Sequence, residues 1–343
     1  MTMKAGIVRR FGVVEIDDVP RPAVGEGEVL VRLRAAGLNR ADVIVRDGRF
    51  PEQPPLPIIL GVEGAGEIAE VGSGVRNLEV GQRVVLLPTL VCGSCEACQS
   101  GVDSRCRALR FLGEHTDGTY AEYLNVPARN AIPAPDSLSH TELAASILPY
   151  TTAWHMLVTR ARLRRGETVL VVGAGSGVGS AAVQLANVLG ARVIATTGTD
   201  GKRAKLVELG AHEVVNYRRE PEFSGAVRAL TDGLGVDVVH NSAGGTTIQE
   251  SIHALRRGGR LIGMGSHSGA RAEIDLYSLY RNEIEFLGAH AADSRELGDL
   301  LPLLADGTLR PVIDSTFALD DVAAAQVRLV SPDRFGKVVL SID

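Results

Sequence analysis

The chain has 343 residues, of which 45% are hydrophobic and 22% are charged, and its net charge is −5. This length is sufficient for two domains with separate cores. The acidic balance and the lack of Lys/Arg runs exclude nucleic acid as the main partner, and no apolar stretch reaches the roughly 20 residues that cross a bilayer. With no charged-then-apolar leader, we expect a cytoplasmic globular protein without a membrane partner.

The first 125 residues are expected to form short β-strands. Residues 28–34 and 67–71 are typical β segments, and clusters of glycine and proline separate such segments. Helical periodicity is scarce in this part of the chain. The sequence therefore predicts a first domain built mainly from strands.

All four cysteines of the chain lie within fifteen residues, at Cys92, Cys95, Cys98 and Cys106. The spacing C-x2-C-x2-C-x7-C is typical of a closed tetrahedral zinc site. The alternative is a pair of disulfides, but C-x2-C spacings make strained disulfides and the expected compartment is reducing. Four sulfur ligands leave no open position, so we expect one structural zinc in a lobe over residues 90–108.

Apolar β segments alternate with helical stretches from residue 168 onward, which predicts a parallel sheet covered on both faces. The expected strands are residues 168–172, 192–196, 236–240, 260–264 and 284–288. After residue 291 we expect one helix and one last strand, residues 336–340. This tail is too short for a domain of its own and should complete the first one.

A glycine-rich loop, residues 173–179, follows the strand at 168–172 and precedes an amphipathic helix. Glycines allow close approach of the backbone to a pyrophosphate, and the helix N-terminus offers free N–H groups. The strict Gly-x-Gly-x-x-Gly pattern does not fit, but the strand–loop–helix context predicts a dinucleotide site. The residues expected to contact the cofactor there are Gly175, Ser176, Gly177 and Val178.

The end of the second strand of this region favours NADPH, with NADH as the alternative. NAD sites usually place an acid there, whereas this chain has Thr197, followed by Lys202. Lys202 can pair with a 2′-phosphate, although it can also be an ordinary solvated lysine. Tyr217 could lie against the adenosine end. Asp200 complicates this prediction because it is acidic and nearby.

Several segments together resemble the medium-chain dehydrogenase/reductase superfamily over essentially the whole chain. They are residues 37–42, 61–67, 118–123, 150–154 and 335–337, with the glycine loop and the four-cysteine lobe. The resemblance implies an α/β fold with a GroES-like β domain, residues 1–148 and 291–343. A Rossmann domain with a doubly wound parallel sheet, residues 149–290, interrupts it.

The ligands of the catalytic zinc in the alcohol dehydrogenases of this superfamily are replaced here by Asn39, Val62 and Leu148. Two acidic neighbours of that site remain as Asp42 and Glu63. The Asn-x-x-Asp arrangement resembles the quinone oxidoreductase and enoyl reductase branch, which lacks catalytic zinc. The four-cysteine lobe departs from that branch.

The resemblance also implies roles for individual residues. Asn39 would donate a hydrogen bond to a nicotinamide ribose hydroxyl or to the substrate oxygen, with a turn asparagine as the alternative. Asp42 would orient Asn39 or a neighbouring backbone group. Thr152 would bond the carboxamide, with a helix N-cap as its alternative role. Phe335 and Lys337 would approach the cofactor from the returning tail.

The implied reaction is hydride transfer from NADPH to a quinone or to an α,β-unsaturated carbonyl compound, a small-molecule substrate. The alternatives are an alcohol or polyol dehydrogenase and a non-catalytic NADPH-binding protein. The proton donor stays open among Tyr150, Arg46 and solvent. A homodimer is expected through the edge strand at residues 284–288, and a homotetramer is the alternative.

Overall fold

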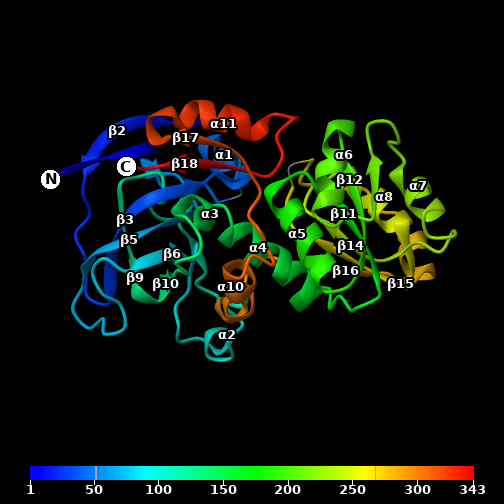
Figure 1. Cartoon of the computed structure of the whole chain (residues 1–343), viewed down its shortest axis with the longest axis horizontal. Coiled ribbons are helices and arrows are strands. Elements are labelled where there is room, and N and C mark those ends of the chain that lie inside the picture. Colours follow the sequence, from blue (N-terminus) through cyan, green and yellow to red (C-terminus); the bar gives the residue numbers. More distant parts are fainter. Residues whose placement is uncertain (51, 267) are drawn as a thin grey trace. The chain divides into compact units, whose positions relative to one another are not determined.

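The computed structural model describes residues 1–50, 52–266 and 268–343, which form two compact units (Figure 1). Unit 1 comprises Met1–Leu148 and Asp293–Asp343, and unit 2 comprises Pro149–Ala292. The division thus occurs after residues 148 and 292, where the sequence analysis placed it after 148 and 290.

Unit 1 is built mainly from antiparallel strands. A seven-stranded sheet has the order β10-β6-β5-β3-β18-β17, with β9 paired to β3. A three-stranded sheet has the order β2-β1-β4, and β7 pairs with β8. The bounds are β1 Thr2–Val8, β2 Glu15–Pro20, β3 Glu28–Gly37, β4 Ile58–Ile59, β5 Glu63–Val71, β6 Arg83–Leu86, β7 Thr89–Leu90, β8 Arg110–Phe111, β9 Tyr123–Pro127, β10 Ala131–Pro133, β17 Ile313–Ala318 and β18 Lys337–Ser341.

The helices of unit 1 are short. Their bounds are α1 Arg40–Arg46, α2 Glu96–Gln99, α3 His140–Ala144, α10 Leu297–Ala305 and α11 Val322–Val330, with 3₁₀ turns at Asp103–Arg105, Ala128–Asn130, Ser294–Glu296 and Leu319–Asp321. Helix α4, Ile147–Trp154, contains the boundary between the units. In Figure 1, α11 runs alongside β17 and β18, which it contacts.

The chain after residue 292 completes unit 1, as the sequence analysis predicted. Strand β18 pairs antiparallel with β3, Val339 opposite Gly37, and parallel with β17. The prediction of a single helix and a single strand there was wrong, because the segment holds α10, α11, β17 and β18. Pro302 lies inside α10, and proline usually interrupts a helical pattern. Strand β17 is a half-exposed edge strand with little apolar alternation.

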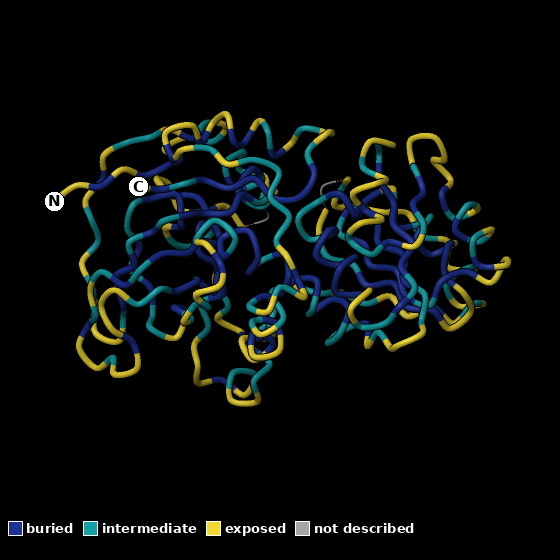
Figure 2. Tube along the Cα trace, in the orientation of Figure 1, coloured by how far each residue is buried: buried dark blue, intermediate teal, exposed yellow. Residues whose placement is uncertain are grey.

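Unit 2 contains a six-stranded, wholly parallel sheet in the order β13-β12-β11-β14-β15-β16. The order reverses between β11 and β14, and ligands of such sheets bind beyond the carboxyl ends of the strands at this point. Figure 2 shows the central strands buried. The bounds are β11 Thr168–Val172, β12 Arg192–Thr197, β13 Glu213–Asn216, β14 Val236–Asn241, β15 Leu255–Gly263 and β16 Glu285–Gly288.

The helices of unit 2 are α5 Gly177–Val188, α6 Arg203–Glu208, α7 Phe223–Ala229, α8 Thr247–Ala254 and α9 Leu276–Arg281, with a π-helical stretch at His155–Arg160 and a 3₁₀ turn at Asp200–Lys202. Strand β15 begins at Leu255, earlier than the predicted residue 260, because charged and glycine residues obscure its first half. Among the described helices, none is long and apolar enough to cross a membrane.

Candidate functional site

The four cysteines converge at one point of unit 1 and form no disulfide. Their sulfur atoms all lie within 4.8 Å of one another. The Sγ–Sγ distances are 3.5 Å for Cys95–Cys98, 3.6 Å for Cys92–Cys106 and 3.9 Å for Cys92–Cys98. Four sulfurs at 2.3 Å from a tetrahedral zinc are about 3.8 Å apart, so the residues present fit a Zn²⁺ ion.

Backbone N–H groups favour metal binding in this lobe, and others connect it by hydrogen bonds to the C-terminal part of unit 1. The N–H groups of Ser94 and Cys95 lower the pKa of the Cys92 thiol to about 5, which favours the thiolate that binds zinc. The backbone N–H of Ser294 donates to Asp103 Oδ2 at 3.1 Å, and that of Ser104 donates to an oxygen of Asp293 at 2.9 Å. The closed ligand set supports a structural role.

The end of β3, where β18 pairs with it, carries a cluster called here the Lys337 cluster: the buried residues Asp42, Glu63, Tyr120 and Lys337 and the half-buried Asn39. The Lys337 ammonium donates to the Leu38 carbonyl at 2.7 Å and to Asn39 Oδ1 at 2.8 Å. It also forms a short ion pair with Glu63. The Lys337 and Glu63 side chains are only 4% and 0% exposed, so this is a pair buried away from water.

The Asn39 side chain is held on both sides by this cluster. Its Nδ2 donates to Glu63 Oε1 at 2.8 Å and to the Gly37 carbonyl at 3.3 Å, while its Oδ1 accepts from Lys337. Both N–H bonds of the amide are thus directed at protein acceptors. The predicted donation from Asn39 to a ribose hydroxyl or a substrate therefore requires one of these hydrogen bonds to be exchanged.

Asp42 is fully buried in the first turn of α1. Its Oδ2 accepts from the Tyr120 hydroxyl at 2.6 Å and from the backbone N–H of Asn39 at 2.6 Å. Its Oδ1 has no hydrogen-bond partner among the described residues. Burial raises the pKa of Asp42 to about 7. The bond to the Asn39 backbone agrees with the predicted orienting role, which stays a prediction.

Glu114 belongs to the same region, although the sequence analysis gave it no role. Burial, and then the nearby Asp42 carboxylate, raise its pKa to about 8. No spacing or motif marks Glu114 in the sequence. Only the fold, which buries Glu114 within reach of the Asp42 charge, reveals it.

The three positions that correspond to catalytic zinc ligands do not form a metal site. Val62 is buried and Leu148 offers only its backbone N–H, which donates to Glu63 Oε2 at 2.9 Å. Asn39 and Glu63 already share the Lys337 ammonium. A divalent cation at these oxygen atoms would meet a fixed positive charge within hydrogen-bond distance, so the residues do not fit a catalytic metal.

In unit 2 the glycine loop turns sharply from β11 into α5. Gly173 has a φ of +75°, and the Ser176 hydroxyl accepts from the Gly179 N–H at 3.0 Å as the helix N-cap. A Cβ atom at Gly179 would lie 2.4 Å from the Gly173 carbonyl oxygen, so only glycine allows this close packing. The N–H groups of Gly177 and Val178 have no acceptor in the described part of the chain and suit a pyrophosphate.

Thr197 and Tyr217 meet at the end of β12. Thr197 is buried, its carbonyl accepts from the Tyr217 N–H at 3.0 Å, and the Tyr217 hydroxyl packs against Gly198. Asp200 forms an exposed ion pair with Arg219 at 2.5 Å and accepts a hydrogen bond from Asn216 at 2.7 Å. The arginine offsets part of the negative charge that would oppose a 2′-phosphate here.

Lys202 and Gly175 occupy the neighbouring turns. Lys202 ends the 3₁₀ turn Asp200–Lys202 and is half-buried, and Gly175 lies between β11 and the N-cap of α5. Both therefore lie beyond the carboxyl ends of the central strands, where a dinucleotide binds in sheets of this type.

Of the remaining predicted residues, Thr152, Phe335 and Tyr150 are buried and Arg46 is half-buried. Thr152 lies inside α4, which excludes the N-cap alternative. Phe335 donates its backbone N–H to Asp314 at 2.8 Å. Tyr150 accepts from Gln184 at 2.8 Å, and burial raises its pKa above the ordinary value. Arg46 donates to Asp47 and to Gln326, at 2.8 and 2.7 Å. Tyr150 and Arg46, the two protein candidates for the proton donor, are therefore both already engaged in hydrogen bonds.

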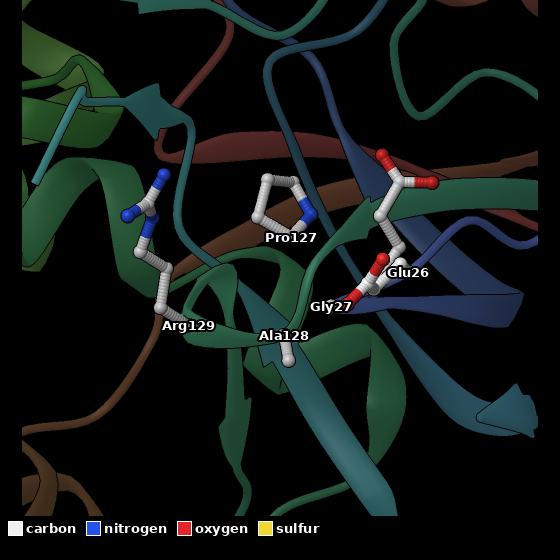
Figure 3. Close-up of a pocket in the computed structure, with 6 residues that line it drawn as sticks. Glu26, Gly27, Pro127, Ala128 and Arg129 are labelled. Carbon is white, nitrogen blue, oxygen red and sulfur yellow. The ribbon is translucent and has the colours of Figure 1, made fainter. Parts of the chain in front are cut away.

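A hollow of about 430 Å³ on unit 1 is shown in Figure 3. Its lining residues are Glu26, Gly27, Glu28, Pro127, Ala128 and Arg129. It lies at the first residue of β3, whereas Asn39 follows the last, and a strand of this length spans roughly 30 Å. The hollow is therefore separate from the Lys337 cluster.

Two family models match the chain. The alcohol dehydrogenase GroES-like domain covers residues 25–136, and the zinc-binding dehydrogenase domain covers residues 177–306. An alcohol dehydrogenase of Geobacillus stearothermophilus is 32% identical over 345 residues, 99% of this chain and 100% of that protein. The chain belongs to the medium-chain dehydrogenase/reductase superfamily. The predicted family and fold class are thus confirmed.

Members of the superfamily similar to this chain carry different names. Acryloyl-coenzyme A reductase of Metallosphaera sedula is 32% identical over 99% of this chain and 100% of its own length. A phenolphthiocerol/phthiocerol polyketide synthase polypeptide of Mycobacterium tuberculosis is 33% identical over 97% of this chain, and the chain spans only 14% of its length.

Solved structures show the same breadth. An NAD-dependent alcohol dehydrogenase has a TM-score of 0.94 and 39% identity, covering 99% of this chain and 100% of that one. A crotonyl-CoA carboxylase/reductase has a TM-score of 0.91 and 26% identity, covering 99% and 88%. The superfamily supports a nicotinamide-dependent oxidoreductase with a small-molecule substrate and a structural zinc, and leaves the substrate undecided.

Proposed function

We propose that this protein transfers hydride from NADPH to a carbon–carbon double bond conjugated to a carbonyl group, and that quinones are a second class of acceptor. The observation that carries the proposal is the buried Lys337 ammonium, bonded to Asn39 and Glu63 where a catalytic metal would need its ligands. Only the structural zinc of the four-cysteine lobe is then expected in the protein.

This arrangement favours reduction of a double bond over oxidation of an alcohol. An alcohol must lose its hydroxyl proton, and a Lewis-acidic metal makes that possible near neutral pH. A conjugated double bond accepts hydride directly, and its carbonyl oxygen carries the charge that develops. Relatives named acryloyl-CoA reductase and crotonyl-CoA carboxylase/reductase support this choice.

Several residues would bind and orient the coenzyme. The N-terminus of α5 and the residues Gly175, Ser176, Gly177 and Val178 suit the pyrophosphate. We propose that Thr152 bonds the carboxamide of the nicotinamide ring. The residues that would support the nicotinamide end of the coenzyme are Asn39, Phe335 and Lys337. The bound coenzyme supplies the hydride.

The preference for NADPH over NADH rests on the end of β12. Thr197 stands where an acid would hold the ribose of NAD, and Asp200 is paired with Arg219. Lys202 supplies positive charge for a 2′-phosphate, as does the exposed Arg218, whose Nε lies near Gly198. Tyr217 supplies a face for the adenine. A solved structure similar to this chain is named an NAD-dependent alcohol dehydrogenase, so the affinities for NADPH and NADH must be compared directly.

We also propose a cytoplasmic homodimer formed through β16, which lies at the edge of the unit 2 sheet. Phe286 on this strand is 44% exposed, and Tyr277 and Tyr280 on α9 are 55% and 64% exposed. Exposed aromatic groups beside an open strand edge are typical of an interface. Analytical ultracentrifugation distinguishes the dimer from a monomer and from the alternative tetramer.

The test compares the rates of NADPH oxidation by different hydride acceptors, with the metal content of the protein measured. The purified protein is supplied with NADPH and, in separate reactions, with acryloyl-CoA, crotonyl-CoA, a simple enone and a quinone, and with NADP⁺ and primary or secondary alcohols. We expect one zinc per chain, oxidation of NADPH by a conjugated acceptor, and no alcohol oxidation. Alcohol oxidation that requires a second equivalent of metal would refute the proposal.

The alternative function is an alcohol or polyol dehydrogenase, which the name of the Geobacillus relative favours. It predicts NAD(P)⁺ reduction by alcohols and little turnover of conjugated acceptors. Coenzyme binding without any turnover would indicate the third possibility, a non-catalytic NADPH-binding protein. The same panel separates all three.

A further inference from the structure

The four cysteines of the zinc lobe differ in their access to solvent. Cys92 is exposed and Cys98 is half-buried, whereas Cys95 and Cys106 are only 8% and 5% exposed. Residues 93–94, which follow Cys92 in the chain, are exposed as well. The susceptibility of a thiolate to oxidation follows its exposure, so Cys92 is the ligand that a dissolved oxidant reaches first.

A second sulfur atom lies directly beside Cys92. The Sγ–Sγ distance from Cys92 to Cys106 is 3.6 Å, and the Cys92 backbone N–H donates to Cys106 Sγ at 3.4 Å. Cys98 Sγ lies farther from Cys92 Sγ, at 3.9 Å. An S–S bond is about 2.0 Å long, so the sulfurs of Cys92 and Cys106 need to approach by only about 1.5 Å to form one. Cys106 is therefore the thiol best placed to react with an oxidised Cys92.

Cys106 also connects the lobe to the C-terminal part of unit 1. It follows the 3₁₀ turn Asp103–Arg105, and its backbone N–H donates to the Asp103 carbonyl at 2.9 Å. The carboxylate of Asp103 in turn accepts from the Ser294 N–H at 3.1 Å. A movement of Cys106 toward Cys92 is therefore expected to weaken the hydrogen bonds that hold the chain at Ser294.

We propose that Cys92 is a site of reversible oxidation by hydrogen peroxide, with Cys106 as the thiol that closes a disulfide. Cys92 Sγ attacks one peroxide oxygen, the O–O bond breaks and hydroxide leaves, so the sulfur becomes a sulfenic acid and the peroxide is reduced by two electrons. The Cys106 thiolate then attacks Cys92 Sγ, and an S–S bond forms as the S–O bond breaks and a second hydroxide leaves. In total, two thiolates, one peroxide and two protons give one disulfide and two waters.

This disulfide removes two of the four sulfur ligands of the lobe. Cys95 and Cys98 alone do not make the closed four-sulfur set of a structural zinc site, so zinc is expected to leave and unit 1 to lose stability. Because Cys92 is exposed, a thiol such as glutathione can attack the disulfide and restore both thiolates. Neither step involves the coenzyme, so these changes are measured independently of the proposed function.

The test is a titration of the zinc-loaded protein with hydrogen peroxide. A chromogenic chelator reports released zinc, and peptide mapping by mass spectrometry without reduction identifies the disulfide. We expect release of one zinc per chain together with a Cys92–Cys106 disulfide, and recovery of zinc binding after a thiol reductant and zinc are added. Zinc that stays bound in excess peroxide, or a first disulfide between Cys95 and Cys98, would overturn the proposal.

Histidine replacements separate the roles of the cysteines, because histidine is itself a zinc ligand. Cys92→His removes the exposed thiol. Cys95→His is the matched control, since it makes the same change of ligand but keeps both proposed partners. We expect peroxide to release zinc about tenfold more slowly from Cys92→His than from Cys95→His, and equal rates contradict the assignment of Cys92. Zinc content before oxidation checks folding, and if either variant lacks zinc the disulfide map of the wild-type protein decides.

Discussion

Substitution of Lys337 by methionine tests the energetics of the buried cluster directly. The change keeps the length of the side chain but removes the ammonium group that bonds to Leu38, Asn39 and Glu63. The Glu63 carboxylate, 0% exposed, then loses its counter-charge in a place that water does not reach. Breaking such a pair by removing one partner costs about 3–5 kcal/mol of the free energy of unfolding.

The lower end of this range is expected, because Glu63 keeps two donors, the Asn39 amide at 2.8 Å and the Leu148 N–H at 2.9 Å. For a unit of about 200 residues, 3 kcal/mol corresponds to a fall in Tm of about 6–12 °C. Scanning calorimetry measures this change, and release of zinc identifies the transition of unit 1.

Two further variants make the result specific. Lys4→Met removes an exposed ion pair with Asp320 in the same unit, where both side chains are at least half exposed, and should change Tm little. The double variant Lys337→Met/Glu63→Gln removes the unpaired charge and should recover a large part of the loss. If Lys337→Met melts within a degree or two of wild type, or the double variant is no more stable than the single one, the account of the buried pair is wrong.

The other predictions concern unit 2 and the zinc lobe. His240 is buried with both ring nitrogens unpartnered among the described residues, and burial lowers its pKa from 6.5 to about 4. The unfolded chain therefore binds more protons below pH 6.5, so stability present above that pH should fall by about 3 kcal/mol as the pH drops to 4. His240→Leu should remove this loss in urea titrations at several pH values. Lys202→Ala should raise the Kd for NADPH about tenfold and leave that for NADH nearly unchanged, by fluorescence titration; equal effects would contradict the NADPH assignment. Chelation should release one zinc per chain and expose four reactive thiols while lowering the Tm of unit 1, and a metal-free protein with unchanged Tm would exclude a structural role.

Local patterns in the sequence were sufficient for much of the site. Four closely spaced cysteines can meet only within one short lobe, and a glycine loop between an apolar strand and a helix can form in few ways. These features depend on neighbours in the chain, which is why the cluster of Cys92 to Cys106 and the glycine loop before α5 could be anticipated, whereas the N-cap role of Ser176 came from the structure. The hydrogen bonds of the Asn39 side chain could not be predicted from the sequence, because its partners, Glu63 and Lys337, are distant in the chain.

The sequence alone determined the family, the two-domain α/β fold and the lack of ordinary ligands for a catalytic metal, since each depends on residue type and local spacing. Tertiary structure decided the rest. Pairing of β18 with β3 brings an ammonium group from the end of the chain to Glu63, and burial, with the charge of Asp42, raises the pKa of Glu114. Protonation depends on burial and on charges that are distant in sequence, so these carboxyl groups acquire their unusual pKa values only when the chain is folded.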